Sequence, residues 1–131
     1  MASSSVVAVE FDARPEQLGI GRALNRAVGL GLGVAVSEAA DLELAVHEIA
    51  SLLVAAATPD AVVRCEYTGH DTVIGVRITA DTRVEPVAGG LGWHIVRALA
   101  GGVVLDCGPP DPGRGGYAVT VVFSWPHIGG V

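Results

Sequence analysis

The most regular hydrophobic pattern in the chain runs through residues 37–58, where apolar side chains recur at steps of three and four residues. This spacing predicts a long amphipathic helix, which the Ser37 hydroxyl can cap. Residues 14–30 carry a weaker stripe that several glycines loosen, and it predicts a second helix. Its apolar members are Leu18, Leu24, Ala27 and Val28. A shorter apolar segment, 91–100, predicts a third helix.

Five short segments alternate between apolar and polar residues or are rich in β-branched residues, which predicts strands. They are 5–11, 61–68, 72–80, 101–107 and 117–125. The second and third of them are adjacent and predict a β-hairpin. Because strands occur as hairpins with helices between them, we expect an α+β protein. It should be a two-layer α/β sandwich, with a mixed, mostly antiparallel sheet and the helices on one face.

Length and charge narrow the class of protein. A chain of 131 residues suits a single domain spanning 1–131, and its 50% hydrophobic content is enough for one core. The net charge of −6 argues against nucleic acid as a direct partner, because phosphate binding favours a basic surface. The most apolar run, 27–36, is too short to cross a bilayer, which needs about 20 residues. No signal peptide is recognisable, so we expect a cytoplasmic protein that binds proteins or small molecules.

A glutamate and a glycine pair are candidates for binding or catalysis. Gly90 and Gly92 precede an apolar helix, and the amides and dipole of a helix N-terminus favour an anion such as phosphate. Glu48 lies on the long predicted helix, where Leu52, four residues later, shares its face. For each of these residues a purely structural role is the alternative to binding or catalysis. Glu48 can be a solvated carboxylate, and the glycines can serve a helix entry with unusual backbone angles.

Two longer segments carry a resemblance to a known family. The order of the elements, DLELAVHEIASLLVAAA at 41–57 and GGLGWHIVRALAGGV at 89–103 resemble the GHKL family of ATP-binding domains. The branch that looks most similar is the bacterial anti-sigma-factor serine kinases. The resemblance covers roughly residues 5 to 125. It implies a Bergerat-type ATP-binding fold, with ATP and Mg²⁺ as cofactors.

The resemblance gives the long helix a catalytic role. In that family a glutamate positions or activates the attacking group, and an asparagine four residues later binds the magnesium. Glu48 matches the glutamate, whereas Leu52 takes the place of the asparagine. Leucine cannot ligate magnesium, which requires oxygen ligands. We therefore expect weak kinase turnover or none.

Two further segments match the family's nucleotide site. Asp81 is similar to the aspartate that binds the adenine amino group, and Arg83 replaces the glycine that follows it. Arg83 would fill the pocket or reach a phosphate. Gly90 and Gly92 match the glycines whose backbone amides face the phosphates. For Asp81 a simple turn residue is the alternative.

By resemblance, such proteins hold a stress-response sigma factor away from RNA polymerase. They release it when an unphosphorylated anti-anti-sigma protein of the STAS type takes the same surface, and they phosphorylate a serine of that antagonist. The family also implies a homodimer. We therefore expect an anti-sigma factor that regulates transcription. One alternative is a catalytically inactive module that exchanges partners without ATP, and another is a signalling domain with no sigma partner.

The cysteines and histidines add no recognisable motif. Cys65 and Cys107 fall on predicted strands, where cysteine usually behaves as a small buried hydrophobe. A redox switch between them is the alternative. Because the histidines lack the spacing of zinc ligands, we expect no zinc site. They are His47, His70, His94 and His127.

Overall fold

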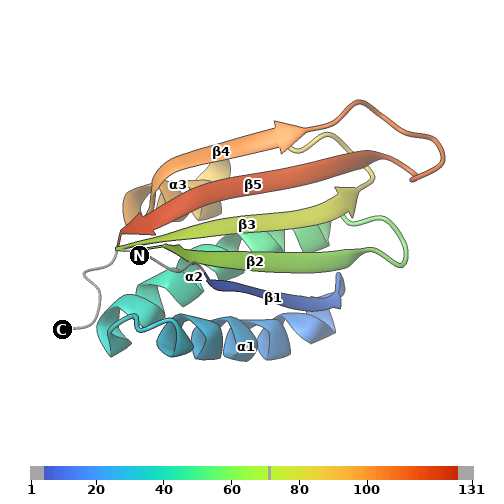
Figure 1. Ribbon diagram of the computed structural model, residues 1–131. Coiled ribbons are helices and arrows are strands. Elements are labelled where there is room, and N and C mark those ends of the chain that lie inside the picture. The colour runs from blue at the N-terminus through green and yellow to red at the C-terminus, as the bar shows by residue number, and fades with distance from the viewer. Residues whose placement is uncertain (1–4, 71, 127–131) are drawn as a thin grey trace.

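The computed structural model describes residues 5–70 and 72–126, and shows a sheet whose helices all lie on one face (Figure 1). The helices are α1 (Leu18–Gly31), α2 (Val36–Ala55) and α3 (Gly90–Leu99), and a short 3-10 turn, η1 (Pro15–Gln17), leads into α1. The strands are β1 (Ser5–Asp12), β2 (Val62–His70), β3 (Val73–Thr82), β4 (Gly101–Cys107) and β5 (Tyr117–Pro126). The element order and the two-layer α+β architecture predicted from the sequence are confirmed.

The strands lie in the order β1-β2-β3-β5-β4, and each neighbouring pair is antiparallel. No parallel pair occurs among the described strands, although the sequence suggested a mixed sheet. The reason is the position of β5. The connection through α3 joins β3 to β4, which run in the same direction, but β5 lies between them and is antiparallel to both.

The core lies between the sheet and α2. This helix buries nine residues, among them Leu42, Val46 and Ile49, which cover the inward side chains of the strands. The long predicted helix therefore has the face that its periodicity indicated. None of the described helices is both long enough and apolar enough to cross a membrane.

Helix α1 only partly presents the predicted face, since Leu18 and Val28 pack against the core but Ala27 is exposed. Leu24 is exposed, and the buried residues are Gly21 against Phe11 of β1, Asn25 against Tyr67 of β2 and Gly29 against α2. A close approach explains the difference, because a Cβ at Gly21 would lie 2.6 Å from Cε1 of Phe11. The Phe11 ring of β1 thus fills the space that a larger helix side chain would need.

A buried polar chain links α1 to β2. The Tyr67 hydroxyl donates to Oδ1 of Asn25 at 2.5 Å, and Nδ2 of Asn25 donates to the carbonyl of Gly21 at 2.8 Å. Cys65 lies two residues before Tyr67 on the same inward face. Burial raises the pKa of the Cys65 thiol to about 12 and also raises the pKa of Tyr67.

Cys65 gives a prediction at alkaline pH. In the unfolded chain its thiol has the ordinary pKa of 9.0, so the folded state keeps a proton that the unfolded state loses as the pH rises above 9. The free energy of unfolding should therefore fall, by about 1.4 kcal/mol at pH 10. Urea unfolding from pH 8 to 10 measures this slope, and Cys65→Ala should remove most of it, leaving the smaller part that Tyr67 begins to contribute near pH 10. An unchanged slope in that variant would show that another group titrates.

Candidate functional site

Two of the predicted site elements meet where α2 packs against α3. The carboxylate of Glu48 lies directly over Gly92, because a Cβ at position 92 would fall 2.8 Å from Oε2 of Glu48. Gly90, the first residue of α3, has a φ of +82°, which favours glycine. The structure thus brings Glu48 and the glycine entry together. It also gives Gly90 a backbone reason to be glycine, whereas a Cβ at Gly92 would meet only the flexible end of the Glu48 side chain.

Leu52 lies one turn beyond Glu48 and lines a small cavity with a volume of about 130 Å³. The cavity is bounded by α2, by the loop before α3, by α3 itself and by inward side chains of β4 and β5. Its lining residues are Ile49, Leu52, Leu53, Ala56, Pro86, Val87, Trp93, Leu105 and Val121. Pockets for drug-sized ligands are larger, about 300 to 1,000 Å³. We call this space the Leu52 cavity.

Asp81 is not brought to Glu48. Ala80 and Thr82, on either side of it in β3, are buried toward the helices, and successive strand residues face opposite sides of a sheet. Asp81 therefore lies on the face away from the helices, where its Oδ1 accepts a hydrogen bond from Nη1 of Arg114 at 3.1 Å. Arg114 comes from the loop between β4 and β5. This loop is consequently tied to the end of β3.

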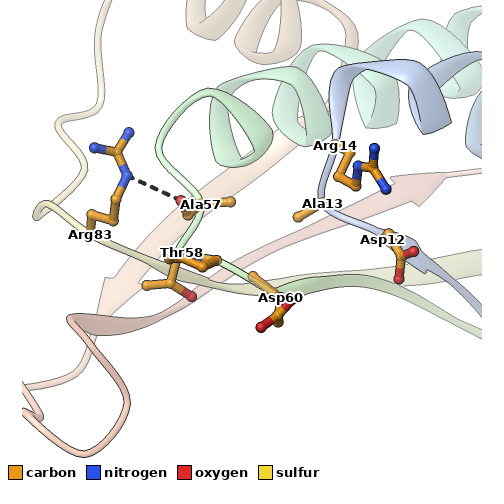
Figure 2. Close-up of a pocket in the computed structure, with 9 residues that line it drawn as sticks. Asp12, Ala13, Arg14, Ala57, Thr58, Asp60 and Arg83 are labelled. Atoms are coloured by element: carbon orange, nitrogen blue, oxygen red, sulfur yellow. Dashed lines mark hydrogen bonds between the residues drawn. The ribbon is translucent and has the colours of Figure 1, made fainter.

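Arg83 lies at the C-terminal end of α2. Its Nε donates to the carbonyl of Ala57 at 3.1 Å (Figure 2), and its Nη2 lies 3.4 Å from the carbonyl of Ala55. Its backbone amide donates to the carbonyl of Ala56 at 2.8 Å. Ala55 is the last residue of α2, and Ala56 and Ala57 follow it. The last carbonyls of a helix have no partner within it and carry the negative end of its dipole, so a guanidinium beside them is stabilising. Arg83 thus caps α2.

Sequence reasoning missed two open polar pockets at this end of the sheet. The first, of about 450 Å³, extends from the end of β1 to the cap made by Arg83 (Figure 2). The second, of about 460 Å³, lies on the open face beside Asp81 and Arg114. Asp60 lines both and has a left-handed φ of 64°. No sequence spacing connects Arg114 with Asp81, so the signal for this pairing was absent.

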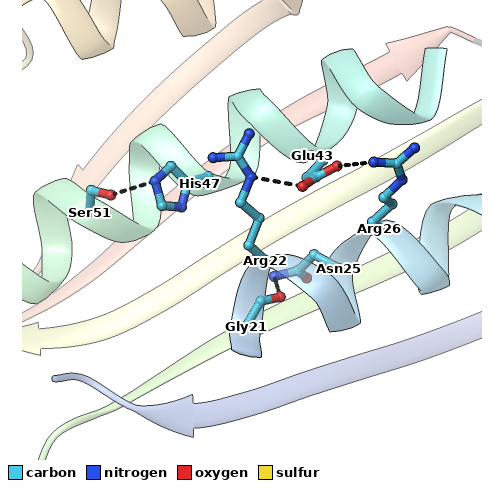
Figure 3. A network of polar contacts seen from close by, with 7 residues as sticks. All are labelled: Gly21, Arg22, Asn25, Arg26, Glu43, His47 and Ser51. Carbon is cyan, nitrogen blue, oxygen red and sulfur yellow. Dashed lines mark hydrogen bonds and ion pairs between the residues drawn. The ribbon is translucent and has the colours of Figure 1, made fainter. Parts of the chain in front are cut away.

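A charged cluster joins α1 to α2 and was also missed (Figure 3). Glu43 of α2 is only 9% exposed, yet it is a carboxylate. Nε of Arg22 donates to its Oε1 at 2.7 Å, and Nη1 of Arg26 lies 3.6 Å from its Oε2. Two guanidinium groups therefore compensate one buried negative charge. Without them, burying the carboxylate would cost a large desolvation free energy.

The two cysteines lie on strands that are far apart in the sheet. Cys65 on β2 and Cys107 on β4 are both free, and β3 and β5 lie between their strands. Three strand spacings separate them by roughly 14 Å, beyond the reach of a disulfide. The hypothesis of a redox switch between these two thiols is therefore wrong.

Of the histidines, Nε2 of His47 lies 3.5 Å from the Ser51 hydroxyl, and His127 lies outside the described residues.

The residues at this site do not fit a magnesium-bound nucleotide. Magnesium requires oxygen ligands, and the side chains that line the Leu52 cavity offer none. Asp81, the expected base contact, lies on the opposite face of the sheet, paired with Arg114. Arg83 is engaged in capping α2. Of the groups expected to serve the nucleotide, only Glu48 and the glycine entry lie together.

Comparisons with known proteins place the chain in a family. No protein-family model matches it. The anti-sigma-F factors RsbW of Mycobacterium tuberculosis strains H37Rv and CDC 1551 are each 32% identical over 122 residues, covering 88% of this chain and 73% of theirs.

A solved structure supports the fold alone. The crystal structure of the RsbU and RsbW domains of a Mycobacterium tuberculosis protein matches with a TM-score of 0.60 at 20% identity. The match covers 97% of this chain and 35% of that one. Because the curated relatives exceed 30% identity over most of their length, the chain belongs to the RsbW family of anti-sigma factors, in the anti-sigma kinase branch of the GHKL fold.

Proposed function

We propose that this protein is an anti-sigma factor that sequesters a stress-response sigma factor and releases it by partner exchange, without ATP turnover. The relationship to anti-sigma-F factor RsbW over 122 residues carries the sigma-binding part. The Leu52 cavity supports the second part, because its apolar lining replaces the oxygen ligands that magnesium requires. Release then depends on an anti-anti-sigma protein of the STAS type competing for the same surface.

One observation favours a second candidate, an ATP-dependent serine kinase that acts on the anti-anti-sigma protein. Glu48 lies over Gly92 at the start of α3, where a helix N-terminus favours an anion. In this candidate Glu48 is the catalytic residue, and Gly90 and Gly92 contact phosphate. Asp81 and Arg83 would have to leave their present partners to reach the nucleotide, which makes this candidate the weaker one.

Partner exchange is tested with purified components. We expect the tagged chain to retain a sigma factor from its own organism and to lose it when an anti-anti-sigma protein is added. Because ATP is not used, the fraction released should be the same with and without Mg-ATP, measured by size-exclusion chromatography. Release that requires ATP would contradict the proposal, as would failure to retain any of that organism's sigma factors.

Isothermal titration with Mg-ATP separates the two candidates directly. For the wild-type chain we expect no heat of binding at millimolar ATP, because the Leu52 cavity is small and lacks oxygen ligands. Heat that is lost in Glu48→Ala or Asp81→Ala would support the kinase instead. Glu16→Ala, which removes an exposed carboxylate from η1, is the control for a general change of charge.

A further inference from the structure

Helix α1 has an exposed apolar face in addition to its buried one. Ile20, Leu24, Ala27 and Gly31 follow one another at steps of four, three and four residues, and all four are exposed. This is the spacing of the positions along which two helices pack in a coiled coil. We call these four residues the α1 seam. Its spacing fits a second helix.

The α1 seam lies over the free edge of the sheet. Helix α1 covers β1 and β2, where it contacts Phe11 and Tyr67. Its Arg22 and Arg26 point toward α2, where both pair with Glu43. At 3.6 residues per turn, the seam lies roughly 150° around the helix from these arginines. It therefore faces away from α2, on the side of α1 where β1 ends the sheet (Figure 1).

Strand β1 lacks the features that keep most edge strands from pairing. Its register with β2 is even from Ser5 to Asp12, and its sequence, SVVAVEFD, contains no lysine or proline. Strand β4, at the other edge of the sheet, has a register shift after Gly101 and a left-handed Gly102 with a φ of 62°. Because bulges, lysine and proline protect an edge, β4 is protected and β1 is open to a further strand.

The charges near this edge are largely compensated within the chain. Before Asp12 at its end, β1 carries one charged residue, Glu10, which accepts a hydrogen bond from Nη1 of Arg64 at 2.7 Å. The two arginines of α1 are held by Glu43. On a chain with a net charge of −6, two copies can meet here without like-charge repulsion. A strongly charged partner would find no free countercharge.

We propose that two copies of this chain form a dimer through β1 and the α1 seam. The two β1 strands pair antiparallel about a two-fold axis perpendicular to the sheet, so that the two five-stranded sheets become continuous. The same axis keeps both helical layers on one face and brings the two seams together. A second copy thus supplies both the strand and the helix that this edge fits. The inference goes beyond the proposed function and does not depend on which sigma factor binds.

Sedimentation equilibrium of the intact chain tests the helix contact. For the wild type we expect a mass about twice the 13.3 kDa of one chain. Leu24→Glu places a charge in the α1 seam and should weaken the dimer about tenfold or more, because burying an unpaired charge is costly. The matched control is Leu52→Glu on α2, since Leu52 is 44% exposed and Leu24 is 45% exposed. This control should leave the dimer intact.

The strand contact has its own pair of variants. Val6→Lys adds a lysine to the edge strand and should also weaken the dimer. Val104→Lys on β4 is the control, since the two valines are 63% and 59% exposed, and it should leave the dimer intact. A mixture of Leu24→Glu and Leu24→Arg should associate more tightly than either variant alone, because opposite charges then meet across the axis. Variants that fail to fold could not show this rescue.

Three results would overturn the proposal. One is a wild-type chain that stays monomeric at every concentration. Another is equal weakening by a variant and its control, which would place the interface elsewhere. The third is a monomer that loses its sigma factor in Leu24→Glu, which would assign the α1 seam to that partner. A dimer that depends on the seam but fails to exchange partners would support this inference and contradict only the proposed function.

Discussion

Gly116→Ala is expected to lower the free energy of unfolding by about 3 kcal/mol, the upper end of the cost of overpacking. Gly116 immediately precedes β5 and lies against the end of β3. A Cβ at this position would overlap the carbonyl oxygen of Thr82, and would lie 3.0 Å from its carbonyl carbon and 3.1 Å from Cα of Arg83. All three atoms belong to backbone, so no rotamer change relieves the clash.

Two other glycines provide controls in the same measurement, urea unfolding followed by circular dichroism. At Gly75 in β3 the nearest atom to an added Cβ is the carbonyl oxygen of Thr68 at 3.8 Å, an ordinary contact. Gly75→Ala should change the free energy of unfolding by no more than about 0.5 kcal/mol. Gly19 in α1 has no atom within 4 Å of its Cβ position, so Gly19→Ala should stabilise by about 0.5 to 1 kcal/mol. If Gly116→Ala behaves like Gly75→Ala, the packing at the start of β5 is looser than described.

Asn25→Leu is expected to lower the free energy of unfolding by about 3 kcal/mol. Leucine has as many side-chain heavy atoms as asparagine but no acceptor, so the main loss is the partner of the Tyr67 hydroxyl, which then stays buried without one. An unsatisfied buried donor costs more than a hydrogen bond contributes, because its desolvation is not compensated.

A double-mutant cycle isolates the free energy of interaction between the Tyr67 hydroxyl and Asn25. Tyr67→Phe removes the hydroxyl, so Asn25→Leu made in that background should cost only about 1 kcal/mol. The difference between the two costs is the interaction energy of the pair, obtained from urea unfolding of the four proteins. Additive effects would show that the hydroxyl and the amide do not depend on each other.

Long elements with a strong period were predictable from the sequence. The apolar residues of 37–58 recur often enough to fix both the helix and its buried face, and the hairpin follows from two adjacent alternating segments. Helix α1 was harder, because its buried face consists of Gly21, Asn25 and Gly29. Hydrophobicity does not mark such a face. It is set by the Phe11 ring on a strand that lies next to α1 in space.

The site shows the same division between local and long-range information. Glu48 and Gly92 meet because two well-predicted helices pack together. The side of the sheet on which Asp81 lies was readable, since Ile78 and Ala80 face inward and the next residue must face outward. Its partner Arg114 was not readable, because the pairing depends on where a glycine- and proline-rich loop turns back. Arg83 likewise caps a helix that ended almost thirty residues earlier.

The position of β1 in the sheet determines when this strand can find its partner during synthesis on the ribosome. Val9 pairs with Cys65, so α1 and α2 are synthesised before the neighbour of β1 exists. During that interval Leu42 and Ile49 have no strands to cover them, and exposed apolar surface of this kind invites aggregation. The β2–β3 hairpin is local in sequence and forms quickly. Its completion therefore gives α2 its first strands to pack against, and β5 later adds Val119, Val121 and Phe123 to the core.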